Sequence, residues 1–227
     1  MKKMTLTIIV FFFLAGIAQA APLSVGFITR INKNVKTFKE IREENIVPQT
    51  SDYSCGPASL ATLLSYYFED EVTEREIINF LLRTTNLKKV RAMKGFSLLD
   101  LKNFAKQRGY KVTGYKMDLE FLVNLDSPVL VPVNIKDYSH FIVFRGIKGG
   151  RVFIADPALG NLTIKVERFL KIWQGNIGLV LEMAGYQPVE PPLELSDEEI
   201  AAFADPGVVR KILGITSIGQ INRSSEF

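Results

Sequence analysis

Two side chains of this sequence could together carry out nucleophilic catalysis. The chain has a single cysteine, Cys55, and a single histidine, His140. A cysteine attacks carbonyl carbons as its thiolate, and a histidine can take the proton from the thiol and later return it. The pair is too small for a structural zinc site, which needs about four ligands, and one cysteine cannot form a disulfide within the chain. The sequence has no calcium-loop spacing and no phosphate-binding glycine motif, so we expect no metal and no cofactor.

The position of Cys55 favours a reactive thiol. A lone cysteine is more often a small buried apolar residue without a chemical role. Here Leu60, Leu63 and Leu64 recur at helical spacing after it, and Pro57 suits the first position of a helix. We therefore expect Cys55 at a helix N-terminus, where unpaired N–H groups and the helix dipole stabilise an anion such as a thiolate.

A third group, Asp156, is expected to meet His140 on a β-hairpin. His140 begins an apolar run typical of a buried strand, residues 148–150 predict a turn, and the strand that returns from Arg151 is followed by Asp156. If those three residues form the loop, Ile147 pairs with Arg151 and His140 lies near Asp156 on one sheet face. A two-residue loop would move one of them to the other face. Each residue alone has an ordinary structural interpretation, but together with Cys55 they are the groups that acyl transfer requires.

These residues and their neighbours resemble the C39 peptidases. This family consists of papain-like cysteine peptidases best known as the leader-cleaving domains of bacteriocin-exporting ABC transporters. The resemblance covers residues from about 40 to 184. It rests on Gln49 six residues before the cysteine, the pair Cys55-Gly56 and the helix after it, His140-Phe141-Ile142-Val143, Asp156-Pro157-Ala158-Leu159-Gly160, and a closing stretch with Glu167, Phe169, Trp173 and Gly175.

The resemblance implies a cysteine endopeptidase that works through an acyl-enzyme intermediate. In such an enzyme Cys55 attacks, His140 acts as general base and then as general acid, and Asp156 orients His140. Gln49 would donate a side-chain N–H to the oxyanion, beside the backbone N–H of Cys55. A donor of this kind is worth roughly 3 kcal/mol in transition-state stabilisation.

Two features depart from the transporter-linked members of the family. Those members usually carry an aspartate immediately before the cysteine, where this chain has Ser54, and no transmembrane region or ATPase follows in this sequence. The chain therefore looks more like the stand-alone exported branch of the family, some members of which accompany bacterial functional-amyloid secretion systems. The resemblance therefore does not imply the double-glycine leader specificity of the transporter domains, because their substrates are met in the cytoplasm.

The first twenty residues predict a cleaved signal peptide. They combine Met1-Lys2-Lys3, an apolar run from Leu6 to Ile17 and the small-residue signature Ala18-Gln19-Ala20. The run is shorter than the ~20 apolar residues that cross a bilayer, so we expect a periplasmic or secreted protein without stable membrane insertion. Removing Lys2 and Lys3 lowers the net charge from +4 to +2, and the remaining cations alternate with acidic residues, which argues against nucleic acid as a partner.

The predicted elements give an α+β fold. Capping boxes at Thr73–Glu76 and Ser97–Asp100 open helices after the Cys55 helix, and a strand at 25–28 with a short helix is expected before it. The second half predicts strands at 110–117, 129–134, 140–147, 151–154, 162–166 and 178–183. A helical N-terminal half packed on a predominantly antiparallel sheet is the papain-like arrangement that the resemblance implies, with the reactive pair between the two halves.

We expect three parts in the chain and leave three functions open. The parts are a signal peptide at 1–20, a C39-like peptidase domain at 21–184 and a partly helical C-terminal extension at 185–227, which begins near Pro188. The leading function is a peptidase acting on an exported peptide or protein, with components of a secretion or amyloid system as further candidate partners. The alternatives are a non-catalytic peptide-binding module and a papain-like acyl transferase, because hydrolysis and transfer share the acyl intermediate. No substrate-binding residue is assigned.

Overall fold

The structure, a computed structural model, describes residues 38–136, 138–186, 193, 195 and 199–200. The expected signal peptide, the expected strand at 25–28 and most of the C-terminal extension lie outside these residues. Within the described part of the chain, no helix combines the length and the apolar character needed to cross a bilayer.

The N-terminal half is helical, as predicted. It contains α1 (Phe38–Glu43), α2 (Cys55–Tyr67), α3 (Glu74–Thr84), α4 (Leu87–Met93) and α5 (Leu98–Gln107). Both predicted capping boxes are present, since Thr73 and Glu76 close the start of α3 while Ser97 and Asp100 close the start of α5. Helix α2 begins at Cys55 itself, so Pro57 is its third residue and not its first. The missing N–H of Pro57 costs no hydrogen bond at this position, because the N–H groups of the first helical turn have no acceptor within the helix.

The sequence did not predict three short helices. These are α4, α6 (Leu119–Val123) and α7 (Val166–Ile172), and η1 (Gln174–Asn176) is a further single turn of 3-10 helix. Helix α7 takes over the end of the strand expected at 162–166. Segments of five to seven residues are too short for helical periodicity to show.

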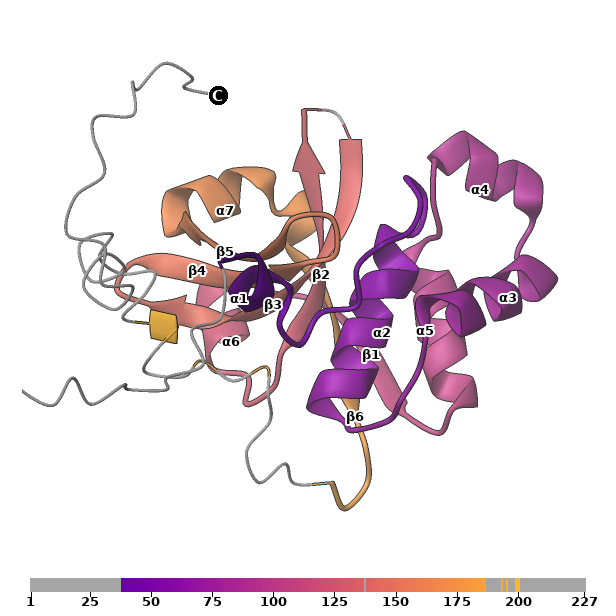
Figure 1. The fold of residues 1–227 in the computed structure, drawn as a ribbon, viewed down its shortest axis with the longest axis horizontal. Coiled ribbons are helices and arrows are strands. Elements are labelled where there is room, and N and C mark those ends of the chain that lie inside the picture. The colour runs from indigo at the N-terminus through magenta and orange to yellow at the C-terminus, as the bar shows by residue number, and fades with distance from the viewer. Residues whose placement is uncertain (1–37, 137, 187–192, 194, 196–198, 201–227) are drawn as a thin grey trace, which may run out of the picture. The chain divides into compact units, whose positions relative to one another are not determined.

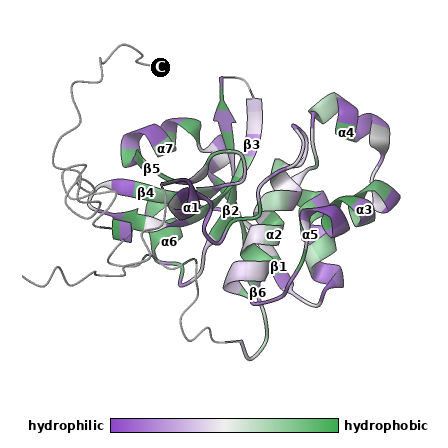
Figure 2. Ribbon diagram, in the orientation of Figure 1, coloured by the Kyte–Doolittle hydropathy of each residue, from purple (hydrophilic) through white to green (hydrophobic). Residues whose placement is uncertain are grey.

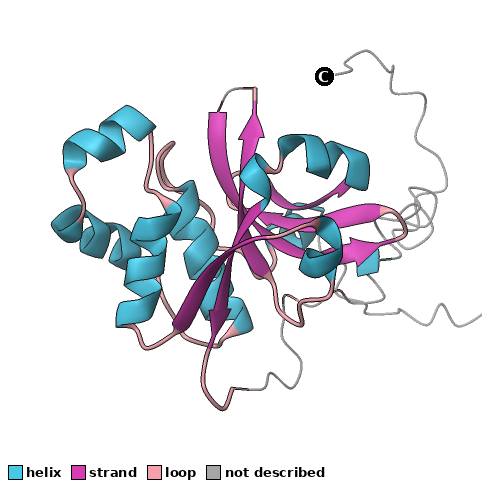
Figure 3. Cartoon of the chain, turned by 180° about the vertical axis from the view of Figure 1, so that it is seen from behind, coloured by secondary structure: helices cyan, strands magenta, loops and turns pink. Residues whose placement is uncertain are grey.

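A six-stranded antiparallel sheet forms the second half, with the order β1-β6-β2-β3-β4-β5. The strands are β1 (Lys111–Lys116), β2 (Val129–Ile135), β3 (Tyr138–Lys148), β4 (Arg151–Asp156), β5 (Gly160–Lys165) and β6 (Ile177–Glu182). All six predicted strands are present, and the α+β arrangement is confirmed. Helices α2 to α5 gather on one side of the strands and α7 lies on the other (Figures 1 and 3).

Two apolar cores hold these layers together. The larger one joins α2, α3 and α5 to the sheet through residues such as Leu64, Leu101 and Val143, and the smaller one joins the opposite face to α6 and α7 through Leu122 and Phe169. Hydrophilic residues lie on the outer helices α3, α4 and α7, as Figure 2 shows. Helix α2 is buried along nearly its whole length, which places its first residue inside the protein and not on its surface.

The β3–β4 hairpin differs from the predicted one in two ways that cancel. Its loop has two residues, Gly149 and Gly150, both with positive φ as a type I′ turn requires, so Lys148 pairs with Arg151. The predicted pairing of Ile147 with Arg151 is therefore wrong. A β-bulge at Arg145 then inserts one extra residue into β3, and beyond it Val143 pairs with Ala155. The bulge restores the predicted register beyond Arg145. His140 and Asp156 therefore lie on the same face of the sheet.

Candidate active site

Cys55 is the first residue of α2, so its predicted position at a helix N-terminus is confirmed. Cys55 is only 3 % exposed, yet it forms part of the wall of a pocket of about 240 Å³. The loop before it is closed by Ser54, whose hydroxyl donates to the carbonyl of Ser51 at 2.8 Å and accepts from the Ser51 N–H at 3.0 Å. The backbone N–H of a first helical residue has no intrahelical acceptor, so it can face an anion.

Helix α2 is fastened to the strand that carries the histidine. The buried hydroxyl of Ser59 donates to the carbonyl of Phe141 at 2.9 Å. A Cβ at Gly56 would lie 3.0 to 3.1 Å from the side chains of Leu101 and Phe141, so a larger residue there would force these side chains to shift. These contacts place the start of α2 beside the start of β3 and fix Cys55 relative to His140.

His140 and Asp156 form a buried pair. Nε2 of His140 and Oδ1 of Asp156 are 2.9 Å apart, and both side chains are 5 % exposed. The same carboxylate oxygen accepts from the backbone N–H groups of Ala158 at 2.8 Å and Leu159 at 3.2 Å. These bonds hold the carboxylate in one orientation, so an imidazole that donates through Nε2 leaves Nδ1 to face the other side.

The environment of His140 favours the imidazolium form. Burial lowers the pKa of His140, but the hydrogen bond and charge of Asp156 and the neighbouring Cys55 together outweigh burial and raise this pKa from 6.5 to about 9. Nδ1 has no hydrogen bond of standard geometry to any described residue. With Nε2 bonded to Asp156, Nδ1 is the ring nitrogen left for proton exchange, which a general base requires.

Gln49 lies next to the Asp156 turn. Its backbone N–H donates to the carbonyl of Pro157 at 2.9 Å, and its side-chain N–H donates to the carbonyl of Ser51 at 3.1 Å. Its side-chain oxygen is buried without a partner among the described residues. The structure thus brings Gln49 into the loop that leads to Cys55, while its role towards an oxyanion stays a prediction.

The pocket at Cys55 has walls that were not predicted from the sequence. One wall is the segment from α4 to α5, and the other comes from β2, β3, η1 and β6. Its lining includes the aromatic rings of Phe96 and Phe141, and Lys94 is the charged side chain among the described lining residues. Lys94 ends α4 in a left-handed conformation, and Gly95 follows it. A glycine at this place is a common signal for the end of a helix, but it could not be used because α4 was not predicted.

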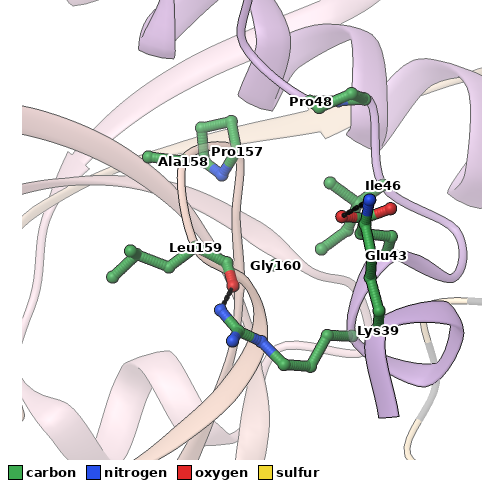
Figure 4. Close-up of a pocket in the computed structure, with 9 residues that line it drawn as sticks. Lys39, Glu43, Ile46, Pro48, Pro157, Ala158, Leu159 and Gly160 are labelled. Atoms are coloured by element: carbon green, nitrogen blue, oxygen red, sulfur yellow. Dashed lines mark hydrogen bonds and ion pairs between the residues drawn. The ribbon is translucent and has the colours of Figure 1, made fainter. Parts of the chain in front are cut away.

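A larger pocket of about 500 Å³ lies behind the Asp156 turn, between α1 and residues Pro157–Gly160 (Figure 4). It contains neither Cys55 nor His140. Arg42 crosses it to donate to the carbonyl of Leu159. Gly160 has a φ of +84°, and a Cβ there would lie 2.5 Å from the carbonyl oxygen of Arg42, so this turn depends on glycine. The described residues contain no group of three His, Cys, Asp or Glu side chains placed to hold a metal.

Comparison with known proteins gives consistent matches. The model of the peptidase C39 family matches residues 43–184. The probable functional amyloid protease FapD of Pseudomonas fluorescens is 34 % identical over 203 residues, which cover 86 % of this chain and 88 % of that protein. Among solved structures, the peptidase domain of Streptococcus ComA, a bifunctional ABC transporter of a quorum-sensing pathway, matches with 25 % identity and a TM-score of 0.52 over 60 % of this chain and 96 % of its own. A double-glycine-motif protease from an AMS/PCAT transporter, solved with a leader peptide, matches with 27 % identity and a TM-score of 0.51 over 60 % of this chain and 89 % of its own.

Proposed function

Because this chain belongs to the peptidase C39 family and is a cysteine peptidase, we propose that it is an exported enzyme whose Cys55, His140 and Asp156 cleave a secreted peptide or protein. The observation that carries this proposal is the arrangement around His140. Its Nε2 is 2.9 Å from the Asp156 carboxylate, and Cys55, at the buried start of α2, helps to raise the pKa of the same ring. A thiol peptidase needs a nucleophile, a base beside it and an acceptor that orients the base, and Cys55, His140 and Asp156 would fill these roles.

The proposed reaction proceeds in two halves. The Cys55 thiolate attacks the scissile carbonyl carbon, so an S–C bond forms and the carbonyl oxygen becomes an oxyanion. The Cys55 backbone N–H and the Gln49 amide donate to this oxyanion. His140 then protonates the departing amine as the C–N bond breaks. In the second half His140 takes a proton from water, the hydroxide attacks the thioester carbonyl, and the thiolate leaves.

The proposed substrate is an extended segment of an exported protein. Among the described residues, the pocket at Cys55 is lined by apolar and aromatic side chains, three polar ones and the cation Lys94, which suits a peptide chain better than a small charged metabolite. The name of the Pseudomonas fluorescens relative supports a substrate that belongs to a functional-amyloid secretion system. We place the enzyme in the periplasm or outside the cell, on the basis of residues 1–20.

A peptide library tests the proposal directly. Peptides made by tryptic digestion of a bacterial proteome are incubated with residues 21–227 of the wild type and with the Cys55→Ala variant, in water enriched in ¹⁸O. New termini that form only with the wild type, with ¹⁸O in the new carboxyl group, would establish hydrolysis and give the cleavage preference. Cleavage products that carry an amine acceptor in place of ¹⁸O would identify an acyl transferase. Peptides that bind both proteins without being cut would identify a binding module and refute the proposed enzyme.

A further inference from the structure

A buried carboxylate outside the proposed catalytic group contacts the loop that carries Gln49. Glu74 is the first residue of α3 and is only 5 % exposed. Its Oε1 accepts the backbone N–H of Thr50 at 2.9 Å, and its Oε2 accepts the Thr50 hydroxyl at 2.6 Å. We infer that Glu74 is a positioning residue that holds Gln49, the neighbour of Thr50, in place for the oxyanion. This inference rests on the proposed function, because an oxyanion exists only if Cys55 attacks a carbonyl group.

The start of α3 does not need Glu74 as a cap. The capping box is complete without it, since Glu76 accepts the N–H of Thr73 at 2.8 Å and its hydroxyl at 2.7 Å, while the Thr73 hydroxyl accepts the N–H of Glu76. Both oxygens of Glu74 point instead to a residue 24 positions earlier in the chain. Burying a carboxylate costs free energy unless it is hydrogen-bonded. The two hydrogen bonds to Thr50 therefore explain why Glu74 is buried.

The other side of the same loop is also fixed. The backbone N–H of Gln49 donates to the carbonyl of Pro157, which directly follows Asp156. Further back, the N–H of Val47 donates to the hydroxyl of Thr62 on α2 at 3.0 Å. Gln49 and Thr50 therefore connect the Asp156 turn to α3, and Glu74 supplies the side-chain anchor on the helical side. Without Glu74, the N–H and hydroxyl of Thr50 would turn to water, and Gln49 would keep its backbone bond to Pro157 while its neighbour loses the anchor on α3.

The chemical consequence falls on the oxyanion and not on the thiol. Losing an oxyanion donor completely lowers turnover by about 100-fold to 1000-fold, and a misplacement of about 1 Å already costs on the order of 100-fold. Glu74→Ala leaves Gln49 present but less well placed, so we expect a loss of about tenfold. The nucleophile and its histidine are held by Ser59 and Asp156, which Glu74 does not touch.

Two small reagents separate these effects without knowledge of the natural substrate. With p-nitrophenyl acetate, the Cys55 thiolate adds to the acetyl carbonyl and forms an oxyanion, after which the C–O bond breaks and p-nitrophenolate leaves. With iodoacetamide, the S–C bond forms as the C–I bond breaks and iodide leaves, so no oxyanion arises. Cys55 is the only cysteine, so every thiol reaction reports on it. We expect Glu74→Ala to slow acylation about tenfold and to leave alkylation within about twofold of the wild type.

Matched variants complete the design. Glu74→Gln keeps both contacts, because its carbonyl oxygen can accept from the Thr50 N–H and its amide can donate to the Thr50 hydroxyl, so it should acylate like the wild type. Glu76→Ala breaks the capping box at the same helix start and lowers the melting temperature, but it should not slow acylation selectively. Thr50→Val removes the hydroxyl bond to Glu74 and keeps the backbone bond, so we expect an intermediate loss of acylation rate. Thr50 is exposed, so this variant should still fold.

A double variant decides whether Glu74 acts through Gln49. If it does, Glu74→Ala combined with Gln49→Ala acylates no more slowly than Gln49→Ala alone. Full additivity, or equal slowing of acylation and alkylation in Glu74→Ala, would make Glu74 a purely structural residue and overturn the inference. Wild-type Cys55 that alkylates no faster than glutathione would instead overturn the proposed function. The two failures are therefore distinguished by the wild-type control.

Discussion

Titration of the single histidine tests the geometry most directly. Burial to 4 % exposure lowers the pKa of His140, so its rise from 6.5 to about 9 must come from Asp156 and Cys55. A shift of this size corresponds to about 3 kcal/mol in favour of the imidazolium. Removing either neighbour should lower the pKa of His140, with Asp156→Asn having the larger effect because the hydrogen bond to Asp156 is the strongest of the raising influences.

The assay is an NMR pH titration of the imidazole protons in protein freed of any affinity tag. Only one histidine signal is present, so no assignment is needed. We expect a midpoint near pH 9 in the wild type, a lower midpoint in Cys55→Ala and the lowest in Asp156→Asn. A wild-type midpoint near 6.5, or an unchanged midpoint in Cys55→Ala, would show that the thiol and the imidazole do not interact and would refute the reasoning.

The same shift sets the direction of the pH dependence. The folded-state pKa of His140 lies above its unfolded value, so its contribution to stability is fully present below about pH 6.5 and is lost as the pH rises through about 9. Peptidase activity needs the protonated ring to release the amine, so its alkaline limb should also lie near pH 9. In Asp156→Asn that limb should move to lower pH, which a rate profile on the best library peptide would measure.

Two further substitutions test the supports of the site by urea unfolding. Arg145→Met should lower the free energy of unfolding by about 3 kcal/mol, because it removes the cation of a largely buried ion pair with Glu199; a loss within experimental error would show that the C-terminal contact carries no stability. Gly160→Ala should cost about 2 kcal/mol and reduce turnover, since its Cβ would meet the Arg42 carbonyl beside the Asp156 turn. Gly150→Ala, at a similar φ of +73° but with no atom within 4 Å, is the matched control and should cost less and leave turnover unchanged.

Much of the local structure could be predicted because its causes lie within a few residues. Thr73 and Ser97 each cap a helix with a carboxylate three positions later, and Leu60, Leu63 and Leu64 repeat at helical spacing after Cys55. The alternation and apolar runs of the second half likewise marked all six strands. Helix α4 was missed because seven residues show no clear period, and the pocket wall at Lys94 was missed with it.

The register of the hairpin shows the limit of such reasoning. Gly149 and Gly150 favour a two-residue turn, which alone would have placed the histidine and the aspartate on opposite faces. The bulge at Arg145 corrects this, and its one mark in the sequence is Gly146, an isolated glycine within the strand that does not by itself say where the extra residue lies. Its arginine is held by Asn161 and by Glu199, the latter 54 residues further along the chain, so the bulge depends on contacts that form only on folding.

The sequence by itself determined which groups are available for chemistry, since one thiol and one imidazole leave a single nucleophilic pair, and it determined the helix start and strand end that carry them. Only the tertiary structure decided that Asp156 accepts from His140, that Cys55 opens into a pocket, and that Glu74 grips the loop before it. The physical reason is the range of the interactions. Caps and periodicity act over about four residues, whereas burial, register and side-chain anchors depend on contacts between residues that are distant in the chain and meet only when the core packs.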